Sequence, residues 1–206
     1  MSEPQIVPLF SQPLYINKTD LTDQMIQSVM DTPCQSDNGG YSNGWMSQTQ
    51  WLTSQPEIRA VVEYNLSKYV YDVLQVDETK HQLEHTSSWV NKHNHGDSGH
   101  GHAHNNAMFS GVMYFKVPPD SGDLMFFVPS MIPTWCTQTL YPEVKEYNIH
   151  NMRESRIPVK DGMIIIFPAH LTHSININNS NQERYSMAFN YILRGEYGYD
   201  DHRLVL

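Results

Sequence analysis

The sequence has few cysteines, few basic residues and no long apolar run. Cys34 and Cys136 are the two cysteines in 206 residues, too few and too far apart for a disulfide framework. No apolar run reaches the roughly 18 to 20 residues that a membrane helix needs. The first ten residues, MSEPQIVPLF, lack the basic start and apolar core of a signal peptide. We therefore expect no membrane association and a reducing, cytoplasmic location.

Positive charge is also scarce, with 13 Lys and Arg against 22 Asp and Glu and a formal net charge of −9. Surfaces that bind nucleic acid are normally basic, so this balance disfavours nucleic acid as a partner. The 39% hydrophobic and 11% aromatic content excludes a disordered chain and supports one substantial core. We expect a single domain that spans residues 1–206.

Helical spacing comes first in the chain and β-like runs follow it. Apolar residues recur at helical intervals over 20–30 and 55–74. From residue 81 onward, eight short strands are predicted: 81–92, 107–117, 124–128, 144–150, 156–159, 163–167, 172–177 and 184–193. This order predicts an α+β fold, mainly β, in which an antiparallel sandwich or barrel packs its N-terminal helices on one face. Residues 1–80 would support the core at 81–198, and 199–206 would form a tail.

Histidine is the residue that the chain has in excess. Eleven are present, and seven of them lie between His81 and His104. In His102-Ala-His104 two imidazoles can leave one face of a strand, because side chains alternate with period two. His173 begins a later strand and can complete a site for iron, zinc, copper or nickel. A carboxylate ligand would have to be Asp97, from the preceding loop, and we favour three histidines.

The remaining histidines receive no catalytic role. His170 lies three residues before His173 and is its rival as the distal ligand. His-rich loops bind metal adventitiously, and we assign His93, His95 and His100 to such a surface loop. For His81, His85, His150 and His202 we expect ordinary structural or surface roles.

A possible anion site follows His173. Arg184 comes eleven residues later, behind a predicted turn at 178–181, so a hairpin would fold it back beside His173. A guanidinium can clamp a carboxylate with two parallel hydrogen bonds, and Ser186 would point to the same side. The alternative is that Arg184 sits at an exposed strand end and pairs with Glu183 or another carboxylate.

Three further polar residues are candidates for the same cavity. Tyr114 has the same parity as His102 and His104. Asn91 and Asn190 are polar residues within strand-like runs, and their alternative role is that of satisfied core groups.

The sequence resembles the 2-oxoglutarate and Fe(II)-dependent oxygenase superfamily, and more narrowly a small oxygenase family frequent in marine phages and bacteria. The resemblance runs from about residue 89 to 198. Its motifs are SWVN (88–91), HAHNN (102–106), SGVMY (110–114), GMIIIFP (162–168), His173 and RYSMAFN (184–190). The superfamily usually has His-x-Asp or His-x-Glu where this chain has His102-Ala-His104, and the narrower family shares the His-x-His form.

The resemblance implies a double-stranded β-helix, or jelly roll, with Fe(II) near one open end and 2-oxoglutarate as cosubstrate. Its distal carboxylate would meet Arg184 and Ser186. Molecular oxygen would be consumed, with release of succinate and CO₂, to hydroxylate a C–H bond of a small-molecule or peptide substrate. A phage-encoded protein would act in the host cytoplasm. The loop at 38–45 and the His-rich loop would form a lid.

Two other functions are kept open. A three-His cupin-type dioxygenase would work without 2-oxoglutarate, and Arg184 and Ser186 would hold the substrate's own carboxylate. A non-catalytic β-roll, as a virion or binding module, would hold at most a closed structural metal. Tyr197 and Tyr199 suggest a contact between copies of the chain, so an oligomer is also open.

Overall fold

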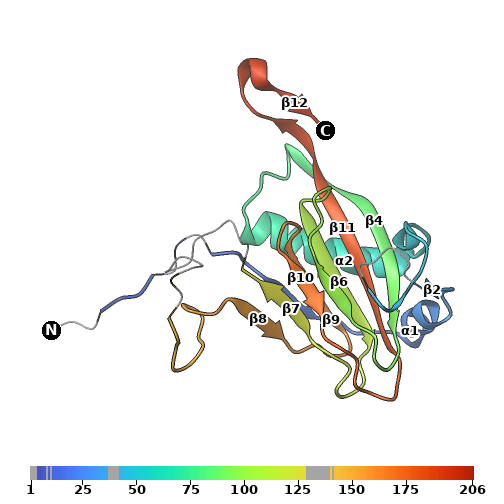
Figure 1. Cartoon of the computed structure of the whole chain (residues 1–206). Helices are drawn as coiled ribbons and strands as arrows, with labels where there is room; N and C mark the ends of the chain where they lie inside the picture. Colours follow the sequence, from blue (N-terminus) through green and yellow to red (C-terminus); the bar gives the residue numbers. More distant parts are fainter. Residues whose placement is uncertain (1–3, 8, 10, 37–41, 129–139, 141) are drawn as a thin grey trace.

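The fold is built from two antiparallel β-sheets that face each other. The computed structural model describes residues 4–7, 9, 11–36, 42–128, 140 and 142–206. Within these residues the larger sheet has the strand order β1-β9-β6-β11-β4-β3-β2, with β12 paired to β11, and the smaller sheet has the order β5-β10-β7-β8 (Figure 1).

The strands of the larger sheet are β1 (Tyr15–Lys18), β2 (Gln35–Ser36), β3 (Trp45–Met46), β4 (His81–His93), β6 (Phe109–Lys116), β9 (Met163–Pro168), β11 (Arg184–Tyr197) and β12 (Leu204–Val205). Those of the smaller sheet are β5 (Gly99–His102), β7 (Leu124–Phe127), β8 (Glu154–Ile157) and β10 (His173–Ile175).

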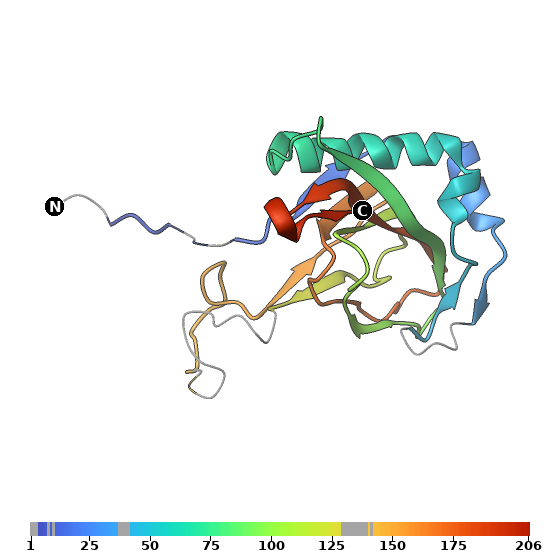
Figure 2. The ribbon, with the colours of Figure 1, turned by 90° about the horizontal axis from the view of Figure 1, so that it is seen from above.

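Two helices cover the outer face of the larger sheet (Figure 2). Helix α1 (Asp23–Met30) begins at Thr22, whose Oγ1 accepts a hydrogen bond from the Met25 backbone N–H at 3.2 Å. Helix α2 (Pro56–Ser67) has Pro56 in its first turn, where a missing N–H costs nothing, and continues as a π-helix over Lys68–Val73. Short 3₁₀ turns occupy Trp51–Ser54 and Asp200–His202. None of the helices in the described ranges has the length and hydropathy of a membrane span.

Alternation along β6 and β11 divides the buried side chains into two cores. One parity, which includes Met113, Met187 and Phe189, packs against the helices. The other parity, which includes Val112 and Tyr114, faces the space between the sheets. There it meets residues from both sheets: Leu124, Phe126, Ile165 and Phe167. Because successive side chains point to opposite faces, a single strand can serve a helix-side core and the interior of the roll.

The predicted α+β, mainly β fold with N-terminal helices is confirmed, and the predicted helices at 20–30 and 55–74 correspond to α1 and to α2 with its π-helix. The predicted strand at 144–150 is wrong, because bends and turns occupy this range. Local hydrogen bonds compete with strand pairing there: Asn148 Oδ1 accepts from the His150 N–H, and Asn151 Nδ2 donates to the Glu146 carbonyl.

Two other sequence expectations concern loops. Part of the predicted His-rich loop is a strand, because β5 lies within it. The partner of β5 in the smaller sheet is β10, which is distant in sequence, so local spacing did not indicate this pairing. Residues 38–41 of the predicted 38–45 lid loop, and Cys136, lie outside the described residues.

Gly111 generates a stability prediction. It lies on β6, where an added Cβ would come within 2.3 Å of the Phe189 ring and 2.9 Å of the Ile165 carbonyl oxygen. We expect Gly111→Ala to lower the free energy of unfolding by about 1 to 3 kcal/mol, through overpacking between paired strands. Chemical denaturation measures this.

The matched control is Gly101→Ala, whose new Cβ would meet only Thr172 Cγ2, at an ordinary 3.9 Å. We expect a change within about 0.5 kcal/mol for this surface position. Equal losses in both variants would contradict the close-approach explanation.

Candidate metal centre

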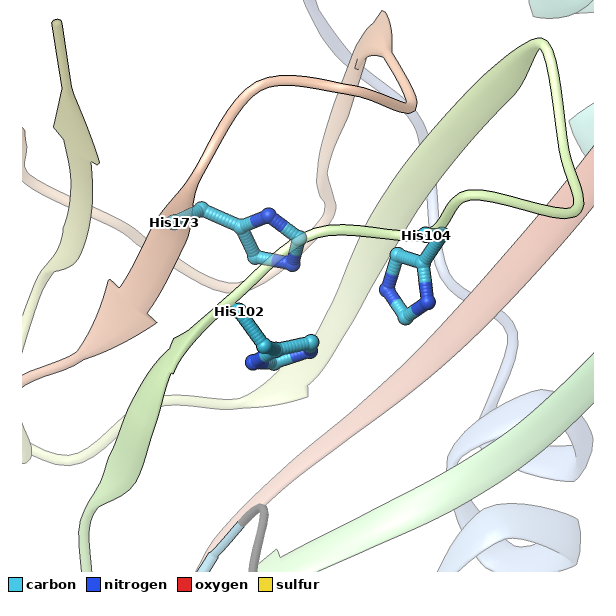
Figure 3. Close-up of side chains that lie close together, drawn as sticks. All are labelled: His102, His104 and His173. Carbon is cyan, nitrogen blue, oxygen red and sulfur yellow. The ribbon is translucent and has the colours of Figure 1, made fainter. Parts of the chain in front are cut away.

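Three histidine side chains converge at one end of the roll. His102 is the last residue of β5 and His173 the first residue of β10, and the antiparallel register places them opposite each other. His104 follows in the loop towards β6, where its N–H donates to the Ala169 carbonyl at 2.9 Å. One potential ligand atom from each of the three lies within 4.8 Å of the others (Figure 3).

The rings of His102 and His173 are held in a defined tautomer. His102 Nδ1 lies 2.8 Å from the His100 carbonyl oxygen, and His173 Nδ1 lies 2.9 Å from that of Leu171. Because a carbonyl oxygen only accepts, each Nδ1 carries the proton, and the lone pair that can bind a metal is on each Nε2. Such a backbone contact behind the ring is the usual way to orient a metal-binding histidine.

Burial also keeps two of the three imidazoles neutral. It lowers the pKa of His173 to about 3, with the neighbouring His102 and His104 as smaller causes, and that of His104 to about 4, assisted by His102. Neutral imidazole is the form that binds metal, so these two rings need not lose a proton first.

The structure places the rival ligands elsewhere. Asp97 is not part of the histidine cluster. Its Oδ2 instead accepts a hydrogen bond from the Asn94 N–H at 2.7 Å within a local turn. His170 is exposed, as are His95 and His100, which lie in the predicted surface positions. The potential ligand set in the described part of the chain is therefore all imidazole.

A cavity of about 620 Å³ opens beside the histidines. Asn91 and Asn190 line it, as predicted, together with Trp89. The Asn190 amide is satisfied by protein groups: its Oδ1 accepts from Ser110 Oγ at 2.6 Å, and its Nδ2 donates to Ser87 Oγ at 3.0 Å. Asn91 Oδ1 accepts from Trp89 Nε1 at 3.1 Å, which leaves its amide N–H groups as donors.

Tyr114 has a different position from the one expected. It is 1% exposed and does not line this cavity, and its side chain belongs to the core between the sheets. It pairs in register with Ser186, so it stands beside the predicted anion site. Burial raises the pKa of its phenol to about 12, against the opposing effect of Arg184.

Arg184 is buried, with 1% of its surface exposed. Its Nη1 donates to the backbone carbonyls of Ser121, at 2.9 Å, and Gly122, at 3.1 Å. The alternative of an exposed pair with Glu183 is wrong, because Glu183 pairs with Lys92 at 2.6 Å. No ion pair to Arg184 is found among the described residues.

Three buried polar atoms around this guanidinium have no hydrogen-bond partner: Arg184 Nε, Ser186 Oγ and Ser121 Oγ. A buried donor without a partner costs about 1 to 3 kcal/mol, and more when it is charged. Burial accordingly lowers the Arg184 pKa, although an arginine stays protonated at neutral pH. Such a group of unsatisfied donors is suited to an anionic ligand.

His93 was misassigned from the sequence. The sequence pattern indicated a surface loop, but β4 extends to His93, whose side chain is 1% exposed. The distance between His93 Nδ1 and Arg184 Nη2 is 3.2 Å. It shares strand parity with Asn91 and Trp89, and all three line the cavity. The spacing of two residues between Trp89, Asn91 and His93 is the sequence pattern that could have indicated that His93 faces the cavity.

The buried imidazoles predict that the metal-free protein loses stability on acidification. The pKa values of His93, His104 and His173 are lowered to about 3, 4 and 3. Between about pH 6.5 and 4 the unfolded chain therefore binds more protons than the folded chain. The free energy of unfolding consequently falls as the pH falls, by up to about 1.4 kcal/mol per pH unit for each histidine. Denaturation of the metal-free protein at about pH 7 and about pH 5 measures the effect, and equal stability would contradict it.

Comparison with known structures gives the same fold. A prolyl-4-hydroxylase from Pseudomonas putida is 13% identical, with 91% of this chain and 96% of that chain covered and a TM-score of 0.56. HygX from Streptomyces hygroscopicus, solved with nickel and 2-oxoglutarate bound, is 11% identical, with 87% and 82% covered and a TM-score of 0.58. The epimerase SnoN, in complex with Fe³⁺, alpha ketoglutarate and nogalamycin RO, is 12% identical, with 88% and 79% covered and a TM-score of 0.59.

Sequence comparison adds the family. Curated protein sequences contain no significant match. The family model described as "Putative 2OG-Fe(II) oxygenase" matches residues 87–190, half of the chain, and this range includes all three clustered histidines and Arg184. The chain therefore belongs to the 2OG-Fe(II) oxygenase family, whose members are oxidoreductases that use Fe(II), 2-oxoglutarate and molecular oxygen.

Proposed function

We propose that the protein is a dioxygenase that hydroxylates a C–H bond of a small-molecule or peptide substrate and converts 2-oxoglutarate to succinate and CO₂. His102, His104 and His173 would hold Fe(II), and Arg184 with Ser186 would hold the distal carboxylate of 2-oxoglutarate. The observation that carries the proposal is the convergence of the three imidazoles, within 4.8 Å, in a chain of this family.

The residues present fit both groups. Imidazole nitrogen is a suitable ligand for iron, and three protein ligands leave coordination positions open for a 2-oxo acid and a further ligand. The unsatisfied Arg184 Nε, Ser186 Oγ and Ser121 Oγ are donors of the kind that a carboxylate requires. Together, bound Fe(II) and 2-oxoglutarate would supply the activation of O₂.

The chain's own residues contribute position and exclusion of water. The backbone contacts behind His102 and His173 orient the rings before any metal binds. Burial of Arg184 removes competing water from its charge, so a carboxylate would bind it more strongly than at the surface. The cavity of about 620 Å³ is of the size that holds a small molecule or a peptide side chain, and Asn91 offers it amide donors.

A second function is favoured by one observation, which is that the clustered ligands include no carboxylate. A three-His dioxygenase without 2-oxoglutarate would use Arg184 and Ser186 to hold the substrate's own carboxylate. Membership of the oxygenase family supports the first function.

His173→Ala tests the metal site. We expect it to weaken Fe(II) binding more than about 100-fold, because a ligand has a larger effect than its orienting partners. The control is His100→Ala, an exposed histidine outside the cluster, which should bind iron as the wild type does. Anaerobic iron titration measures both, and similar losses in the two variants would indicate adventitious binding in the His-rich segment.

Anaerobic titration of the Fe(II)-loaded protein with 2-oxoglutarate tests the cosubstrate. We expect a saturable visible charge-transfer band of a chelated 2-oxo acid. In Arg184→Met, which keeps the side-chain bulk and removes the charge, 2-oxoglutarate affinity should fall about 30-fold or more while iron binding persists. If the wild type binds iron but shows no such band, the result would contradict the use of 2-oxoglutarate and favour the three-His dioxygenase.

A further inference from the structure

His93 makes two side-chain contacts that no part of the proposed chemistry uses. It stands opposite Arg184 in the register of β4 and β11. Its Nδ1 lies 3.2 Å from Arg184 Nη2, and its Nε2 lies 3.4 Å from Ser42 Oγ. Both ring nitrogens are therefore engaged, one by the guanidinium and the other by the segment that precedes β3.

The surrounding backbone is shaped around this ring. At Gly44 an added Cβ would come within 2.9 Å of His93 Cδ2. The Gly44 N–H donates to Ser42 Oγ at 2.7 Å, and Asn178 Nδ2 donates to the His93 carbonyl at 2.9 Å. The ring is thus closely covered, and its orientation is determined by its neighbours.

The contact with Arg184 determines the tautomer. A guanidinium only donates, so His93 Nδ1 must present a lone pair and the proton must reside on Nε2. Burial, and then the charge of Arg184, lowers the pKa of His93 to about 3, so the ring is neutral at physiological pH.

Within the described part of the chain, the hydrogen-bond acceptors of Arg184 are consequently neutral: the carbonyls of Ser121 and Gly122, and the imidazole of His93. Asp123 acts on Arg184 only through its field, and its carboxylate lies 4.0 Å from Arg156 instead. A carboxylate in the place of His93 would neutralise the guanidinium and compete with an incoming anion.

We propose that His93 is a positioning residue for Arg184, which fixes the guanidinium through a neutral acceptor and so keeps its charge available for the distal carboxylate of a dicarboxylate cosubstrate. This inference rests on the proposed function, since it assigns His93 to the same cosubstrate site. It makes residue 93 a determinant of selectivity for 2-oxo acids that carry a second carboxylate.

The test compares His93→Asn with His93→Asp, two side chains of nearly equal size that differ in charge. Asparagine can place Oδ1 where the imidazole places Nδ1, whereas aspartate adds a negative charge beside Arg184. Calorimetric titration of the Ni(II)-loaded proteins uses two probes, 2-oxoglutarate and 2-oxopentanoate, which lacks the distal carboxylate.

We expect His93→Asp to weaken 2-oxoglutarate binding about 30-fold or more and His93→Asn to keep it within about threefold of the wild type. The affinity for 2-oxopentanoate should be the same in all three proteins. The inference is overturned if the two variants lose 2-oxoglutarate equally, or if His93→Asp weakens both probes alike. A wild type that binds Ni(II) but neither 2-oxo acid would instead overturn the proposed function.

A second measurement needs no variant. Nitrogen NMR of the metal-free wild type, between about pH 6 and 8, should show His93 with a bare Nδ1 and a protonated Nε2. A protonated Nδ1 would exclude it as the acceptor of Arg184 and overturn the inference.

Discussion

The structure depends on the pairing of β11 with β4 along one edge and β6 along the other. Because successive side chains of a strand point to opposite faces, this central strand presents one set of residues to each side of the sheet. Met187 and Phe189 face the helices and stabilise the outer core. Arg184 and Ser186 belong to the opposite parity and enter the interior, where unsatisfied polar groups gather. One pairing pattern therefore determines both the stable core and the candidate cosubstrate site.

The smaller sheet makes the complementary contribution. Its register places His173 opposite His102, and the loop after β5 brings His104 to them. Burial lowers the pKa values of His104 and His173 and keeps both rings neutral, so Arg184 is the buried charge around which the site is arranged. Its protein partners among the described residues are neutral acceptors, which leaves a full positive charge in a low-dielectric environment. The structure tolerates this cost at the position that the proposed function assigns to the distal carboxylate of 2-oxoglutarate.

Several features could be predicted from the sequence because they depend on local spacing. The helices follow from apolar residues at helical intervals, and the proximity of His102 and His104 follows from their separation by one residue. Residues 144–150 and His93 were wrongly interpreted for a shared reason. Whether a β-like run pairs depends on a partner strand, and whether a histidine in a polar stretch is buried depends on what covers it. At 144–150 local asparagine hydrogen bonds replace a partner, whereas at His93 β11 and the 42–44 segment cover the ring.

The sequence by itself determined the order of the candidate ligands along the chain and the parity that places Arg184 and Ser186 on one face. These follow from bond geometry and strand periodicity, which act over a few residues. The tertiary structure alone decided that His104 rather than Asp97 joins His102 and His173, and that His93 rather than a carboxylate contacts Arg184. Those choices depend on strand register and loop packing between segments far apart in the chain, because a shift of one residue in pairing turns every side chain to the other face.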